Sequence, residues 1–178
     1  TATALVGLGT ASTKSYADLE QNIGGVETLF KNSAETVIVN ANKAYTTAGM
    51  SANEYMETVT SFSASLLQSL GNDTSKAASY ADRAIIDMSD NANKMGTDMS
   101  LIQNAYNGFA KQNYTMLDNL KLGYGGTQAE MQRLIKDASK LKDVQNELGI
   151  TVDANSMSFG NIVNAISVMQ KKMDIAGT

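Results

Sequence analysis

The apolar residues of this chain recur every three or four positions in one segment after another, and no proline interrupts them. That spacing matches the 3.6-residue period of an α-helix, whereas the side chains of a strand alternate every second residue. At average usage a chain of 178 residues would contain roughly nine prolines, and proline breaks helix interiors. The pattern predicts an all-α fold, and the length allows one domain with its own core, or two small ones.

Glycines divide this apolar pattern into pieces of helical length. We expect a helical bundle or array of about six to seven helices separated by glycine-containing turns. The expected turn glycines are Gly49, Gly71, Gly123, Gly125, Gly126 and Gly149. The expected helices cover about residues 12–30, 33–48, 51–70, 73–88, 99–110, 127–148 and 158–173, with a short helical turn at 116–120 and a polar interval at 89–98.

One face of each piece collects the side chains that we expect in the core. In the second piece these are Val37, Ala41, Ala44, Tyr45 and Ala48. Gly24 and Gly25 interrupt the first piece, so we expect a break there. The β-branched segment TVIVN (36–40) favours a strand locally, but the apolar spacing before and after it predicts a helix.

The chain begins at Thr1 inside the apolar stretch TATALVGLGTA, so we expect it to be an internal piece of a longer polypeptide. We assign residues 1–14 to an apolar lead-in and residues 15–149 to the main helical module. Residues 150–178 form a C-terminal helix that either packs on the module or leads to a following segment. The lead-in is about half the length needed to cross a bilayer. We therefore expect membrane contact only through segments outside this chain.

The residue types that are missing restrict the chemistry. The chain has no cysteine, histidine or tryptophan, which removes the usual zinc ligands, the thiol nucleophile and the commonest general base. We expect no catalytic residue, no cofactor and no metal site. The net charge of −4 argues against specific nucleic-acid binding, because a duplex-binding module needs a basic stripe to neutralise phosphates.

The most suggestive short motif is GYGGTQAEM, residues 123–131. A phosphate-binding P-loop has Lys and then Ser or Thr directly after its last glycine, whereas Thr and Gln follow Gly126 here. Thr127 and Glu130 instead match a capping box at the start of a helix. The motif therefore predicts a tight turn and a helix cap, not a phosphate site.

Ser51 and Glu54, in the segment SANE, form a second expected capping box. Glu54 and Glu130 are also the strongest candidates for catalytic carboxylates, since each lies at a helix start in a polar setting. A glycosidase needs a second carboxylate across a cleft, and the sequence shows no such arrangement. We therefore favour the capping role for both glutamates.

Most methionines fall on apolar helix faces, where a flexible thioether fills gaps in a core. Met95 and Met99 are the two that we consider for an exposed, adaptable surface. Tyr106, Phe109 and Tyr114 have rings that could stack on bases, but their helical spacing favours core packing.

Three long stretches carry more information than these motifs. SYADLEQNIGGVETLFKNSAETV (15–37), TAGMSANEYMETVTSFSASLLQSLG (47–71) and DMSDNANKMGTDMSLIQNAYNGFAKQNYTMLDNLKLGYGGTQAEMQRLIKDA (87–138) resemble the tail tape measure proteins of phages and prophages of Gram-positive bacteria. The resemblance covers residues 15–138, is looser over 139–160, and returns in IVNAISVMQKKMDIAGT at the end of the chain.

This resemblance implies a virion structural protein of the phage tail, assembled in the cytoplasm of the host bacterium. Such a protein sets the length of the tail tube and leaves the tube when DNA is ejected. The implied partners are other copies of itself, the tail tube protein, and baseplate or tail-tip proteins. A ruler should show long unbroken helical periodicity, whereas these pieces are short and separated by glycines. We therefore expect a helical module that folds back on itself.

Two other roles stay open within the same resemblance. Some tape measure proteins carry peptidoglycan-degrading domains, and a transglycosylase-like one would use Glu54 or Glu130 as its acid. The apolar start suggests a membrane-inserting segment for DNA delivery as the other alternative.

Overall fold

The computed structural model describes residues 12–177, and the all-α prediction is confirmed, since no strand occurs in that range. Of the predicted lead-in, residues 1–11 lie outside the described residues. The described part contains eight α-helices and two short 3-10 helices: α1 (Ser12–Phe30), η1 (Lys31–Ser33), α2 (Ala34–Ala48), α3 (Ala52–Ser69), α4 (Thr74–Met95), α5 (Met99–Ala110), η2 (Leu117–Leu120), α6 (Gln128–Lys140), α7 (Lys142–Leu148) and α8 (Phe159–Lys172).

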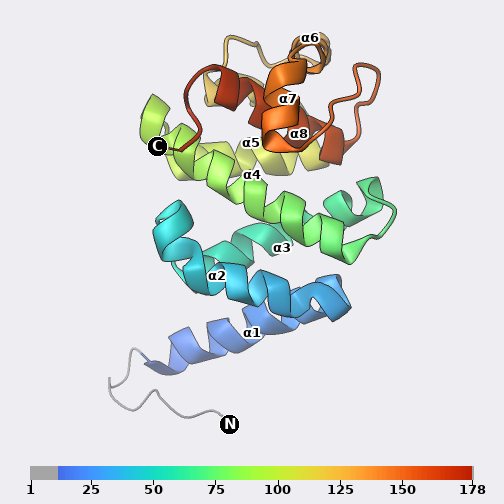
Figure 1. Cartoon of the computed structure of the whole chain (residues 1–178). Coiled ribbons are helices and arrows are strands. Elements are labelled where there is room, and N and C mark those ends of the chain that lie inside the picture. The colour runs from blue at the N-terminus through green and yellow to red at the C-terminus, as the bar shows by residue number, and fades with distance from the viewer. Residues whose placement is uncertain (1–11, 178) are drawn as a thin grey trace.

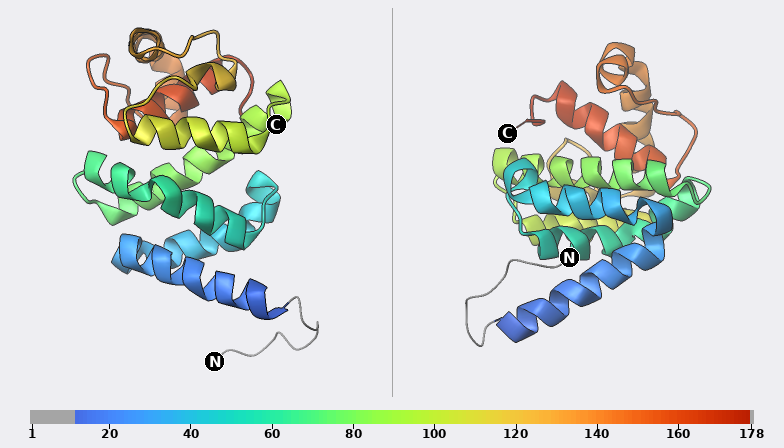
Figure 2. Two further views of the ribbon diagram at one scale, coloured as in Figure 1. Left: turned by 180° about the vertical axis from the view of Figure 1, so that it is seen from behind. Right: turned by 60° about the horizontal axis from the view of Figure 1, so that its bottom comes forward.

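The helices form a stack in which each packs on its neighbours in space (Figure 1). α1 lies at one end and packs mainly on α2 and α3, and these two helices contact α4. α4 and α5 form the middle of the stack, and α6, α7 and α8 form the other end. Figure 2 shows the same order from behind, and its second view shows α1 projecting from the rest.

α8 is the buried centre of the upper half of the stack. Ten of its 14 residues are buried, and it contacts α3, α4, α5, α6 and α7. A helix that is covered on all sides is expected to be apolar on all sides, and Ile162, Val163 and Ile166 fit that rule. The predicted C-terminal segment 150–178 thus supplies the element around which α4 to α7 pack.

Small residues are frequent among the buried positions of α2 and α4, which contact each other. α2 buries Ala34, Ala41, Ala44 and Ala48, and α4 buries Ala77, Ala78, Ala81 and Ala84. Larger rings fill the junction with the upper half, where Phe62 of α3 meets Phe159 of α8 edge to face at a centroid distance of 5.9 Å. The core therefore runs without interruption from α1 to α8.

The predicted break at Gly24 and Gly25 is wrong, because α1 is continuous through both glycines. Gly25 lies against α3, where a Cβ atom would stand 3.5 Å from Thr60 Cγ2. Packing of α1 on α3 therefore offsets the weak helix propensity of the two glycines.

Two other boundaries differ from the prediction. The polar interval 89–98 was expected between helices, but α4 continues to Met95, because Ser89, Asp90 and Asn91 are buried there. The expected helix 127–148 is divided at Leu141, whose ψ is 65°. The last carbonyl groups of a helix have no partner within that helix. At the end of α6, the buried side chain of Gln145 donates to two of them, the carbonyls of Ala138 at 2.9 Å and Ser139 at 3.1 Å.

The predicted buried face of the helix at 33–48, now α2, is confirmed for Val37 and the three alanines. It is wrong for Tyr45, whose side chain is 80% exposed. Tyr45 directly follows buried Ala44, and adjacent residues on a helix point about 100° apart. The segment TVIVN is helical, as predicted. No helix in the range 12–177 is both long and apolar enough to span a bilayer.

The continuity of α1 can be tested by replacing Gly24 with alanine. A Cβ atom at Gly24 meets nothing within 4 Å, and alanine is a better helix former by up to about 1 kcal/mol. We expect Gly24→Ala to raise the free energy of unfolding in urea by up to that amount. A loss of stability would contradict a helical backbone at this position.

Candidate functional site

The glycine loop 123–131 forms a helix cap. Thr127 Oγ1 accepts from the backbone N–H of Glu130 at 3.1 Å. The Glu130 carboxylate reaches back to the N–H of Gly125 at 3.0 Å, where an ideal capping box would bond the N–H of Thr127. Arg133 pairs with that carboxylate at 2.7 Å and donates to the Gly123 carbonyl at 3.0 Å. These bonds attach the loop to Glu130 and Arg133 of α6.

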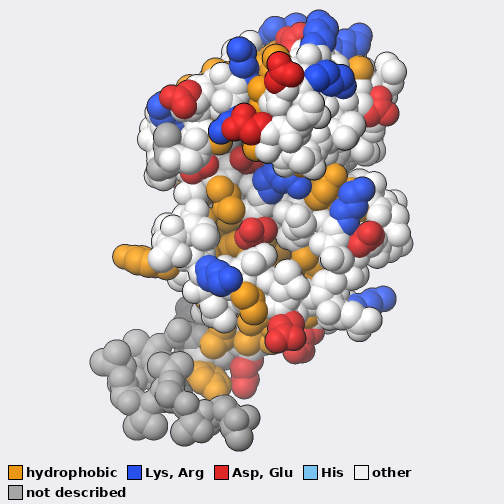
Figure 3. All heavy atoms as spheres, viewed as in Figure 1, with side chains coloured by type: hydrophobic (Ala, Val, Ile, Leu, Met, Phe, Trp, Pro, Cys, Tyr) orange, Lys and Arg blue, Asp and Glu red, His pale blue; other side chains and the backbone are white. Residues whose placement is uncertain are grey.

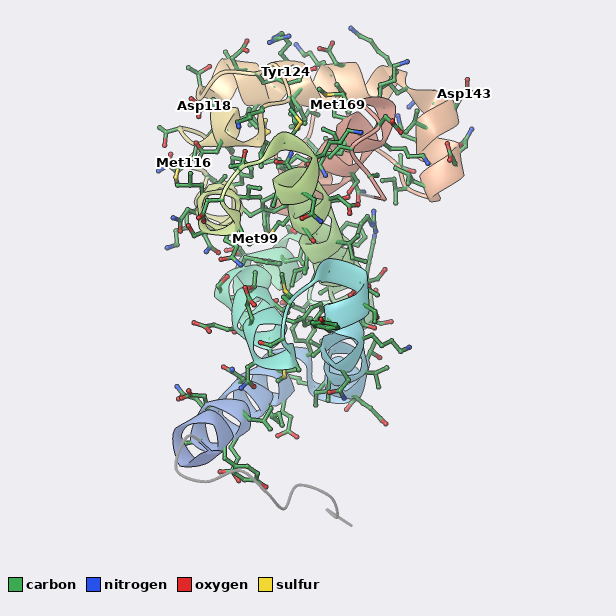
Figure 4. All side chains as sticks on the ribbon, turned by 90° about the vertical axis from the view of Figure 1, so that its left-hand side faces the viewer. Met99, Met116, Asp118, Tyr124, Asp143 and Met169 are labelled. Carbon is green, nitrogen blue, oxygen red and sulfur yellow. The ribbon has the colours of Figure 1, made fainter. Side chains whose placement is uncertain are left out.

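Gly126 is required by a close approach of two backbone segments. A Cβ atom at this position would lie 2.1 Å from the carbonyl oxygen of Thr115. Beside it, the Arg133 guanidinium lies over the Tyr124 ring at 4.2 Å, and the Tyr124 hydroxyl donates to Asp137 at 2.9 Å. Figure 4 shows Tyr124 at the end of the molecule formed by α6. The loop is therefore fixed on both sides.

The other predicted caps lie at the ends of helices. Ser51 Oγ accepts from the N–H of Glu54 at 3.2 Å at the start of α3. The expected turn glycines with a positive φ are Gly49, Gly71, Gly123 and Gly149, with values of 64°, 65°, 85° and 64°. Gly96 has the same conformation at the end of α4 and was missed, because it lies in the polar interval that was not expected to be helical.

The two glutamates considered as acids have different surroundings. Hydrogen bonds from Arg133 and from the Gly125 N–H lower the pKa of Glu130 to about 2. A general acid at neutral pH needs the opposite shift. Glu54 is exposed and lies with Glu57 at a small hollow of about 230 Å³ between α3 and α5. The two carboxylates lie on the same helix, one turn apart, not across a cleft.

The aromatic residues considered for base stacking lie in the core. Tyr106, Phe109 and Tyr114 are 7% exposed or less, and the Phe109 ring lies 5.8 Å from that of Tyr106 and 6.5 Å from that of Tyr114. Met95 and Met99 are half-buried and pack against the core. Across residues 12–177, no group of three acidic side chains is placed to hold a metal ion.

A cluster of buried polar side chains joins α4 to α8, and the sequence analysis did not identify it. The Ser167 hydroxyl donates to the Asp87 carboxylate, and Gln170 Nε2 donates to the Asp87 carbonyl at 2.9 Å. Asn91 Nδ2 donates to Gln170 Oε1 at 2.8 Å and to the Leu120 carbonyl at 2.9 Å. These bonds connect residues that lie up to 83 positions apart in the chain.

Two neighbouring residues of α4, Ser89 and Asp90, bind the end of α2 and the C-terminal segment. The Ser89 hydroxyl donates at 2.9 Å to the carbonyl of Ala48, the last residue of α2. Asp90 accepts at 2.7 Å from the N–H of Gly177. α4 therefore connects the lower half of the stack, the upper half and the C-terminal segment through polar contacts.

Asp87 is the most strongly perturbed carboxyl in this cluster. Burial raises its pKa to about 7, and the carboxylate of Asp90 acts in the same direction. The hydrogen bond from Ser167 and the charge of Arg83 oppose the shift but do not cancel it. Asp87 is only 5% exposed, and burial without full compensation favours the protonated form of a carboxyl.

Arg83 lies on the same face of α4, between two surface hollows. One hollow, of about 580 Å³, lies towards the start of α4 and the loop before α8. The other, of about 560 Å³, lies towards the end of α2 and the C-terminal segment. Arg83 Nη1 donates to Asn164 Oδ1 at 2.8 Å, and its guanidinium lies 4.8 Å from the centre of the Tyr80 ring. The side chain is thus held in one orientation.

Comparisons of the chain with protein-family models, with curated proteins and with solved structures give no significant match.

The pH dependence of stability tests the assignment of Asp87. Its pKa is about 7 when folded and about 3.9 when unfolded. Between these values the folded state keeps a proton that the unfolded state has lost, so stability falls as the pH rises from about 4 to about 7. The amide introduced by Asp87→Asn cannot titrate. We therefore expect the free energy of unfolding of this variant to rise relative to that of the native chain as the pH increases from about 4 to about 7. The upper limit of the gain is about 1.4 kcal/mol for each unit by which the folded and unfolded pKa values of Asp87 differ.

The measurement is urea unfolding of both proteins at pH 4.5 and pH 7.5. Asp143→Asn is the matched control, because Asp143 is exposed on the outer side of α7 (Figure 4). The control should change little between the two pH values. If the free energies of unfolding of Asp87→Asn and Asp143→Asn depended on pH in the same way, the titration of Asp87 would not be the cause of the pH dependence.

A second variant tests the glycine loop. Gly126→Ala places a methyl group against the Thr115 carbonyl, and a clash with backbone cannot be relieved by rotating a side chain. We expect a loss of about 1–3 kcal/mol in the free energy of unfolding, the usual cost of overpacking. Gly125→Ala is the neighbouring control, since its Cβ atom would stand 3.6 Å from Glu130 Cγ, an ordinary contact. A neutral Gly126→Ala would contradict the close approach.

Proposed function

We propose that this chain is a structural module of a phage tail tape measure protein. The tape measure protein takes part in tail tube assembly and length determination and is released when DNA is ejected, and within it this module serves as a folded packing segment, not as the ruler. The resemblance of residues 15–138 to that family supports the identity. The folded-back helical stack supports the role of a module with a definite shape. Its location would be the tail of the virion, after assembly in the host cytoplasm.

The main structural support for the proposal is that the chain reverses direction between short helices and does not extend as one long helix. The longest helix in the described part of the chain, α4, has 22 residues, which corresponds to about 33 Å at 1.5 Å per residue. As a single helix the 178 residues would reach about 270 Å. A stack of short helices contributes far less length per residue than an extended helix. Such a segment is suited to packing and anchoring more than to measuring.

The surface is compatible with passage beside DNA. The net charge is −4, and a chain with a net negative charge has little overall attraction for a phosphate backbone. Figure 3 shows that Lys, Arg, Asp and Glu side chains are mixed over the upper end, above α6 and α7. On the same face, apolar side chains are visible over the lower half, near α1 and α2. We propose that the partners are other copies, the tail tube protein and tail-tip proteins.

Solution scattering tests whether the isolated chain keeps this folded-back form. A compact domain of this length has a radius of gyration near 16 Å by the usual scaling, and the projecting α1 should raise the value slightly. An extended array of separate helices would give a much larger radius. That result would remove the structural basis for a module.

The role in assembly requires variants in the parent tail protein. One variant deletes α5 to η2, residues 99–120, and a second carries the length-neutral change Gly126→Ala. If the segment acts as a folded module, both variants should reduce the number of infectious particles. If the segment acts as a ruler, the deletion should shorten tails by about 1.5 Å per residue with normal infectivity, and Gly126→Ala should leave tails unchanged. Electron micrographs of tails and plaque counts distinguish these outcomes.

A further inference from the structure

The larger of the two hollows beside Arg83 has one side that is held rigidly. Its volume is about 580 Å³, within the usual range of about 300–1,000 Å³ for small-molecule sites. One side is the first half of α4, and the other is the loop between α7 and α8 with the first turns of α8. We refer to this hollow as the Arg83 cleft.

The loop that forms the second side is fixed by two asparagines of α8. Asn161 Nδ2 donates to the carbonyls of Asp153 and Ser156 at 2.8 and 2.7 Å, and Asn161 Oδ1 accepts from the Asp153 N–H at 2.9 Å. Asn164 Nδ2 donates to the Thr151 carbonyl at 2.9 Å. A loop held by so many bonds from a buried helix keeps its shape when a ligand enters, which reduces the entropy cost of binding.

The first side presents two cationic groups, of which Arg83 is held in place. Arg83 is held by Asn164 and by the Tyr80 ring, and the Tyr80 hydroxyl accepts from Asn164 Nδ2 at 3.1 Å. Lys76 Nζ lies 5.7 Å from the centre of the same ring. Lys76 and Arg83 therefore extend from one face of α4, two turns apart, into the same cleft. A pre-organised guanidinium and an ammonium group that line the same cleft suit the oxygen atoms of an anion.

One carboxylate opposes them. Asp153 lines the loop side of the cleft, and its Oδ1 accepts from the N–H of Asn155 at 2.9 Å in a local turn. The charged side chains of the cleft are thus two cations and one anion. The local excess of positive charge contrasts with the net charge of −4 on the whole chain.

From these contacts we infer that the Arg83 cleft is a binding site for a small oxyanion, a phosphate or carboxylate group, held between Arg83 and Lys76. The site is independent of the proposed role in the phage tail. A free ion and a phosphate or carboxylate group on a larger molecule would use the same contacts.

Binding can be measured on the full chain by amide chemical shifts in nuclear magnetic resonance spectra. Inorganic phosphate, acetate and chloride are added separately at one ionic strength. We expect phosphate or acetate to give saturable shifts in residues 76–83 and 149–161, and chloride to give none. Saturation by phosphate but not acetate would assign the site to phosphate groups, and the reverse would assign it to carboxylates. Identical shifts with all three salts would overturn the proposal.

Charge variants provide a sharper test, since their effects should differ in sign. Arg83→Gln removes a charge-assisted contact and should weaken binding roughly ten-fold or more. Lys76→Gln should weaken binding several-fold. Asp153→Asn should strengthen it, and the amide oxygen that this change introduces can still accept from the N–H of Asn155.

Lys136→Gln is the matched control, because Lys136 is exposed on α6 and does not line the cleft. Equal weakening by Lys136→Gln and Lys76→Gln would show that attraction is diffuse, and would overturn the proposal. Arg83→Gln also leaves Asp87 without its cationic neighbour, so its fold is checked by circular dichroism. If that variant does not fold, the opposite effects of Lys76→Gln and Asp153→Asn decide the question.

Discussion

Polar side chains on α4 are removed from water, so they must find hydrogen-bond partners in other elements, and these partners determine how the halves of the stack meet. An unpaired buried polar group costs about 1–3 kcal/mol, which makes a misplaced α8 unfavourable. Asp87 and Asn91 bond to Ser167 and Gln170 of α8. Ser89 bonds to the last carbonyl of α2. Apolar packing brings the helices together, while these bonds select one register between them.

The sequence was sufficient for the local features of the fold. Apolar spacing predicted the helices and most of their buried faces, because periodicity is a property of neighbouring residues. Ser51 and Thr127 were identifiable as caps for the same reason, since their partners lie three residues away. Tyr45 was misplaced because a helical face has a limited width, and one residue beyond Ala44 already points to solvent.

Features that depend on distant partners could not be predicted. The continuation of α4 through a polar interval depends on α8 and on the end of α2, and the continuity of α1 depends on its contact with α3. The Arg83 cleft was missed entirely, because its two sides come from segments more than 60 positions apart. A single polar residue on a helix is expected to face solvent until its partner is known. The buried Asp87 is the clearest case.

Because α8 lies at the centre of the upper half, the resistance of the stack to tension depends on which end of the chain is pulled. α1 lies at the edge of the stack and packs mainly on α2 and α3, so tension applied at the N-terminal end would detach α1 first and leave the packing of α8 intact. Tension applied at the C-terminal end would act on a helix enclosed by five others, and its removal would disrupt most of the upper core in one event. The part of the core that is lost first under load would therefore depend on which end of the chain is pulled.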